Sequence, residues 1–161
     1  MISETKFIEN IRQICSISSQ LCKNPWILKK SINSEWIEMN DFVYNQLREK
    51  YKRSFSICYN EIYNVPVFWF NIYDIDGKLV FLNDFKDFIF RKELNKNELL
   101  EFISQGEHPF LGIAFYNLHP CKTSELMQNF KGNNYVISFL SLINSTIFYL
   151  NFPLKFYSNA C

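Results

Sequence analysis

The segment His119-Pro120-Cys121-Lys122-Thr123 carries the side chains whose types and spacing best suit covalent chemistry. Proline fixes the backbone dihedral φ beside the cysteine and removes a hydrogen-bond donor, which favours a rigid loop with an accessible thiol. Lys122 and a protonated His119 would place positive charge beside the thiol, and positive charge favours the thiolate form. Because thiolate is the nucleophile and thioesters are energetic acyl donors, these residues predict acyl transfer through Cys121.

Two other interpretations of Cys121 stay open from the residues alone. A free cysteine is usually a small buried hydrophobic residue, so core packing would also account for it. His119 equally fits a loop histidine bonded to a backbone carbonyl. A cysteine hydrolase would need a histidine base within reach of the thiol. The other histidine is His108, but no glycine-rich oxyanion loop or helix N-terminus is evident beside Cys121, which argues against a hydrolase.

The remaining cysteines predict neither a disulfide framework nor a metal site. The chain has five cysteines and two histidines, with no Cys-x-x-Cys pair and no zinc-ligand spacing, so we expect no metal and no cofactor. Cys15 and Cys22 fit core positions on a helix. Cys58 alternates away from the apolar face of its strand, which would leave it exposed, and Cys161 falls at the last position.

Composition excludes several classes of protein. Seventeen basic and sixteen acidic residues leave a net charge of +1, which argues against a nucleic-acid-binding protein. Hydrophobic residues make up 48% of the 161 residues, enough for one core, so we expect a single domain over 1–161. The first residues do not resemble a secretory signal. The longest apolar window, Val136–Leu150, spans about 15 residues, short of the roughly 20 that a membrane helix needs, so we expect a soluble cytoplasmic protein without stable membrane insertion.

Period-two alternation of apolar residues predicts an antiparallel sheet over about 26–82. The alternation is clear in Tyr51–Tyr59, and Val65–Tyr73 has β-forming residues throughout, as in a central strand. Asp76-Gly77 is typical of a tight hairpin turn into a further strand, Lys78–Leu82. Another short strand is expected over Ile113–Leu118.

Helical spacing of apolar residues predicts an N-terminal helix over about 4–21, with Ser3 as its N-cap, and a closing helix over about 133–147. Two further helices are expected, one from about Asn83 with Phe85, Phe88 and Ile89 on one face, and one over Lys96–Ser104. Between them and the closing helix we expect an active-site loop over about 105–127. This order of elements predicts an α+β fold, an antiparallel β-meander flanked by helices.

The segment Gln105–Met127, reading QGEHPFLGIAFYNLHPCKTSELM, closely resembles the active-site segment of the autophagy E2-like enzymes. It is most similar to the member that attaches the autophagy ubiquitin-like modifier to a lysine of an acceptor protein. The resemblance extends to Tyr59–Val67 and to Asn151–Leu154, and covers about the last two thirds of the chain. Ala114 departs from the pattern, since relatives often have proline there.

The resemblance implies an E2-like core, in which Cys121 accepts the modifier's C-terminal glycine as a thioester from an E1-like enzyme. His119 falls at the position thought to support that thioester, and Tyr59 matches a strand tyrosine proposed to lie near the cysteine. The implied partners are the autophagy E1-like activating enzyme, the modifier and the acceptor protein that carries the target lysine. Two alternatives remain: a sibling E2-like enzyme that transfers a related modifier to phosphatidylethanolamine, and a non-catalytic binding module on the same scaffold.

Overall fold

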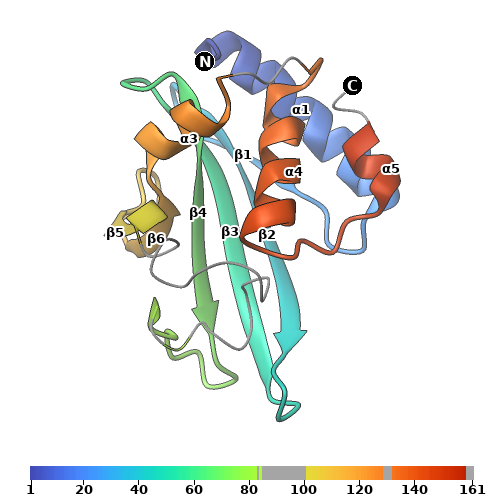
Figure 1. Cartoon of the computed structure of the whole chain (residues 1–161), viewed down its shortest axis with the longest axis vertical. Coiled ribbons are helices and arrows are strands. Elements are labelled where there is room, and N and C mark those ends of the chain that lie inside the picture. The colour runs from blue at the N-terminus through green and yellow to red at the C-terminus, as the bar shows by residue number, and fades with distance from the viewer. Residues whose placement is uncertain (83, 85–100, 129–131, 159–161) are drawn as a thin grey trace.

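A computed structural model describes residues 1–82, 84, 101–128 and 132–158 and shows an α+β fold. Six strands form one antiparallel sheet in the order β1-β2-β3-β4-β6-β5. Helices α1, α4 and α5 cover one face of this sheet, and α3 lies at one end of β4 (Figure 1). The predicted fold class is confirmed.

The first four strands form the predicted meander, and two later strands extend it. The strands are β1 Ile27–Lys30, β2 Glu35–Tyr44, β3 Lys50–Asn60, β4 Val65–Tyr73, β5 Ile103–Glu107 and β6 Ala114–Leu118. The hairpin at Asp76-Gly77 forms, with Gly77 at φ 80°, but the strand expected over Lys78–Leu82 is reduced to a single bridge between Tyr73 and Leu79. The sheet is therefore not confined to 26–82, because β6 pairs with β4 and brings β5 with it.

The described helices are α1 Glu4–Leu21, α3 Pro120–Leu126, α4 Tyr135–Thr146 and α5 Leu154–Tyr157. Ser3 caps α1 as predicted, since its side chain accepts a hydrogen bond from the Lys6 amide. The helix expected from Asn83, with Phe85, Phe88 and Ile89, lies outside the described residues, as does the first part of the helix expected over Lys96–Ser104. The last two residues of that prediction belong to β5, which contains only one buried apolar residue, Ile103, and depends on its pairing with β6.

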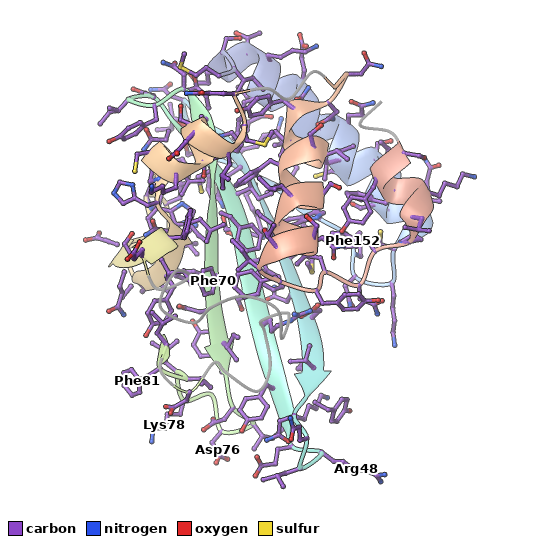
Figure 2. All side chains as sticks on the ribbon, viewed as in Figure 1. Arg48, Phe70, Asp76, Lys78, Phe81 and Phe152 are labelled. Atoms are coloured by element: carbon purple, nitrogen blue, oxygen red, sulfur yellow. The ribbon has the colours of Figure 1, made fainter. Side chains whose placement is uncertain are left out.

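The core lies between the helices and one face of the sheet. Alternate residues of β3 and β4, including Phe55, Phe68 and Phe70, are at most 2% exposed and surround Phe148. Phe70 points from β4 into this layer, whereas Arg48 and Asp76 mark hairpins at the end of the sheet away from α3 (Figure 2). The helices thus hold one face of the sheet rigid, and the end near α3 carries the candidate site.

Candidate active site

Cys121 lies in the first turn of α3, directly after β6, so the expectation that no helix N-terminus lies beside it is wrong. His119 is the N-cap of this helix and Pro120 is its first residue. The active-site loop predicted over about 105–127 is wrong at its two ends, where the end of β5 and α3 lie, whereas β6 confirms the strand expected over Ile113–Leu118. The reason is that proline, with its fixed φ and missing amide proton, is well suited to the first position of a helix, so Pro120 begins α3.

The side chains of His119 and Cys121 meet. Nδ1 of His119 lies 2.6 Å from Sγ of Cys121 and 3.4 Å from the backbone nitrogen of Cys121. Because a thiol and an amide are both donors, this ring nitrogen is placed as an acceptor, and the neutral ring then carries its proton on Nε2. The imidazole is thus positioned to take the thiol proton and leave a nucleophilic thiolate.

The position of His119 is fixed by its backbone. Its amide donates to the carbonyl of Phe102 at 2.8 Å, and its own carbonyl accepts from the amides of Lys122 and Thr123 at 3.0 and 3.2 Å. Thr123 is buried, which anchors the first turn of α3 against the protein. The ring of Tyr63 contacts the imidazole edge-on, with 6.5 Å between the ring centroids.

Tyr59, the tyrosine implied by the resemblance, is partly buried near the end of β3. Its hydroxyl lies 2.8 Å from the carbonyl oxygen of Ile2 and 2.8 Å from Oδ1 of Asn64. Burial and the charges of Glu4 and Glu61 raise the pKa of this hydroxyl. Its described hydrogen bonds therefore join the N-terminal residues to the β3–β4 turn.

The tyrosine whose ring contacts His119 is Tyr63, which the sequence reasoning did not single out. It lies in the turn between β3 and β4, where its amide donates to the Asn60 side chain at 3.0 Å and the next residue, Asn64, adopts φ 53°. A signal was present in the sequence, because two asparagines four residues apart between strands are typical of a turn. The resemblance implies Tyr59, but the turn places the ring of Tyr63 against His119.

His108 is 1% exposed and lies on the face of the sheet that the helices do not cover. Its Nδ1 accepts from the Phe110 amide at 3.3 Å, and its Nε2 lies 3.0 Å from the Ser56 hydroxyl and 3.6 Å from Sγ of Cys58. Burial lowers the pKa of this imidazole to about 4, against a smaller opposing effect of Glu38. His108 is thus a neutral residue of the interior that contacts Cys58, and its described contacts do not include Cys121.

Of the other described cysteines, Cys58 is buried, and Cys15 is partly buried, as Cys121 is. Cys58 is 1% exposed, so its predicted exposure is wrong: residues 108–113 fold over this face of the sheet, with Phe110 stacked on Trp36 at 4.1 Å. Burial raises the pKa of the Cys58 thiol to about 12 and that of Cys15 to about 11. Cys22 is partly buried, and Cys161 lies outside the described residues.

Within the described part of the chain, no three His, Cys, Asp or Glu side chains are grouped in a way that would hold a metal ion. None of its described helices is both long and apolar enough to cross a membrane.

Comparison with known proteins shows one consistent family. Residues 8–153 match the model described as autophagocytosis associated protein, active-site domain. The human ubiquitin-like-conjugating enzyme ATG10 is 36% identical over 120 residues, which are 67% of this chain and 53% of that protein. The enzyme of the same name from Dictyostelium discoideum is 31% identical over 112 residues, 58% of this chain and 49% of that protein. The chain spans about half the length of these curated relatives.

Two solved structures share the fold. A crystal structure of an autophagic E2, Atg10, aligns with a TM-score of 0.58 and 17% identity, over 91% of this chain and 96% of that one. The solution structures of KmAtg10 align with a TM-score of 0.53 and 17% identity, over 94% of this chain and 98% of that one. Both support the antiparallel sheet with helices on one face.

Proposed function

The chain belongs to the family of autophagocytosis-associated active-site domains, and from this premise we propose that it is an ATG10-like conjugating enzyme that carries a ubiquitin-like modifier as a thioester on Cys121. The observation that carries the proposal is the contact between His119 and Cys121 at the head of α3. The buried Cys58 also has a histidine neighbour, but at 3.6 Å from Nε2 of His108, whereas Cys121 is partly exposed in the first turn of a helix with His119 Nδ1 at 2.6 Å. Cys58 is buried, whereas Cys121 is only partly buried.

The first step is transfer of the modifier from an E1-like enzyme. The thiolate of Cys121 attacks the carbonyl carbon of the E1-bound thioester, a new carbon–sulfur bond forms, and the E1 cysteine leaves as thiolate. His119 Nδ1 lies 2.6 Å from Sγ and is placed to accept the Cys121 proton as the sulfur attacks. One thioester replaces another, so the step is nearly balanced in energy.

The second step joins the modifier to a lysine of the acceptor protein. A neutral lysine amine attacks the thioester carbonyl and a carbon–nitrogen bond forms. The carbon–sulfur bond then breaks, the nitrogen loses a proton, and Cys121 leaves as thiolate and takes up a proton in turn. Donors that face the developing oxyanion lower the barrier of such a step. His119 is positioned to return the proton to the leaving sulfur, because its Nδ1 faces Sγ. An isopeptide bond is the product.

The proposal is tested with purified chain, E1-like enzyme, modifier and ATP. We expect an adduct of chain and modifier that is cleaved by a thiol reagent. When the acceptor protein is then added without any further protein, we expect the modifier to be transferred to it. A matched reaction contains vesicles with phosphatidylethanolamine in place of the acceptor. A modified lipid with an unmodified acceptor would assign the chain to the sibling activity, and no thiol-sensitive adduct would make it a binding module.

A further inference from the structure

The N-terminal residues of the chain are bonded to the turn that carries Tyr63. The Ile2 amide donates to the carbonyl of Asn64 at 2.9 Å, and the Tyr59 hydroxyl lies 2.8 Å from both the Ile2 carbonyl and the Asn64 side chain. Ile2 is 7% exposed although the neighbouring Met1 is 78% exposed. We call Ile2, Tyr59 and Asn64 the N-terminal tether.

The tether is attached to a rigid support. Ser3, directly after Ile2, caps α1, and Phe7 in the next turn contacts the ring of Tyr59 with 5.5 Å between centroids. Further along α1, the carbonyl of Asn10 accepts from the side chain of Asn134, the N-cap of α4, at 3.2 Å. The position of Ile2 is therefore set by the helical layer that covers the sheet (Figure 1).

The tether holds one end of the turn, and β3 holds the other. The Tyr63 amide donates to the side chain of Asn60, the last residue of β3, at 3.0 Å. Asn64 adopts φ 53°, a left-handed conformation that asparagine tolerates better than most residues and that its bonded neighbours stabilise. Tyr63 lies between these two fixed points, 37% exposed, with its ring against His119.

We propose that the N-terminal tether is a positioning element of the active site: it fixes the β3–β4 turn so that Tyr63 holds the His119 ring with Nδ1 on Cys121. The catalytic meaning of this contact rests on the proposed function, whereas the positioning itself is a property of the free chain. Tyr59 acts at a distance from the thiol, through Asn64 and Tyr63. The route from tether to thiol consists of described contacts at each step.

The test observes the His119 ring directly. The chain has two histidines, so ¹⁵N-labelled histidine gives two sets of ring signals, with those of the buried His108 as an internal control. Tyr59→Phe removes only the hydroxyl, and Ile2→Pro removes the amide donor, replaces the buried side chain and fixes φ at this position. The matched control is Tyr73→Phe, because the Tyr73 hydroxyl accepts from Asn71 at 2.9 Å at the end of β4 that joins the Asp76 hairpin, away from α3 (Figures 1 and 2).

We expect Tyr59→Phe and Ile2→Pro to shift the His119 ring signals in the direction that Tyr63→Ala shifts them, and to leave His108 unchanged. Tyr73→Phe should leave both histidines unchanged. The rate at which iodoacetamide alkylates Cys121, followed by peptide mass spectrometry, should change by about 3- to 10-fold in the tether variants, the effect of losing one ordinary hydrogen bond.

A double-mutant cycle separates positioning from general loss of stability. In a Tyr63→Ala chain, Tyr59→Phe should change the alkylation rate no further, because the route from the tether to His119 is already broken. An equal effect of Tyr59→Phe in both backgrounds, or unchanged His119 signals in both tether variants, would overturn the proposal. None of these measurements uses E1, modifier or acceptor, so their failure is distinct from a failure to form the thioester.

Discussion

Nδ1 of His119 lies 2.6 Å from Sγ of Cys121, and the single residue between them, Pro120, begins a helix. The contact is built by two rigid elements, because β6 ends at Leu118 and α3 begins at Pro120. A histidine in a flexible loop would reach the thiol only part of the time. Here Nδ1 of His119 faces the sulfur already in the chain that carries no modifier.

His119→Ala is expected to slow transfer to the acceptor more than charging by E1. Transfer requires the amine to lose a proton and the sulfur to gain one, and a positioned side chain that moves such a proton typically contributes about 10²- to 10⁴-fold in rate. The two half-reactions are measured separately by single-turnover gels. His108→Gln is the matched control, since the second histidine is buried on the other face of the sheet. Equal slowing of both half-reactions by His119→Ala would indicate a structural role.

Cys121 should be alkylated well before Cys58 and Cys15 in the folded chain. The pKa of Cys58 is raised to about 12 and that of Cys15 to about 11, both by burial, so near pH 8 these thiols hold little thiolate. Peptide mass spectrometry after a short exposure to iodoacetamide gives the order. In guanidinium chloride the three rates should converge, and a Cys58 rate equal to that of Cys121 in the folded chain would contradict the described burial.

His108 should make the chain less stable in acid. Its pKa of about 4 in the folded state lies below the ordinary histidine value of about 6.5, so the unfolded chain binds the extra proton between these values. The free energy of unfolding should therefore fall as the pH falls from about 6.5 to 4, by at most about 3 kcal/mol.

Urea unfolding at several pH values measures this slope, and His108→Gln should remove most of it. The Gln variant keeps a donor toward Ser56 but cannot ionise. The pKa of Glu35 is lowered to about 2, chiefly by its hydrogen bond with Arg12, so its own effect falls at lower pH. An unchanged slope in the variant would assign the acid sensitivity to other groups.

Asp41→Ala should destabilise the chain strongly. Asp41 and Arg53 form a bidentate ion pair that is 5% and 2% exposed, and Arg53 also donates to the Tyr149 carbonyl at 3.1 Å. Removing one partner leaves a buried charge unpaired, which costs about 3–5 kcal/mol. The matched control is Glu9→Ala, since the exposed Lys6–Glu9 pair is worth about 1 kcal/mol or less. Similar losses in the two variants, measured by urea unfolding, would contradict this account.

The sequence predicted the fold where local pattern and packing agree. The apolar stripe of α1 and the alternation in β3 are both repeated over many residues, so 4–21 and the central strands were predicted almost to the residue. β5 was missed because it contains one buried apolar residue and a glycine, and its structure depends on pairing with β6. Such a strand has little local signal, since its hydrogen-bond partner supplies most of its stability.

The candidate site was predictable in part for the same reason. Cys121 and His119 are neighbours along the chain, so their meeting depended only on local conformation, although the helix that begins at Pro120 was expected as a loop. Tyr63 reaches His119 across more than fifty residues, and no periodicity encodes that contact. Cys58 was misplaced because the residues that cover it, around Phe110, fold back from another part of the chain.

The most direct test of the central claim uses a chain in which Cys121 is the only cysteine. Cys15, Cys22, Cys58 and Cys161 are replaced by serine or alanine, and this chain is incubated with E1-like enzyme, modifier and ATP. We predict a thiol-sensitive adduct in the amount that the native chain forms.

The same reaction with Cys121→Ser in the native chain should give an adduct that resists thiol reagents and is cleaved by hydroxide, because an alkoxide is a far poorer leaving group than a thiolate. Loss of the adduct in the folded single-cysteine chain, or a thiol-sensitive adduct on Cys121→Ser, would place the thioester on another residue and contradict the account.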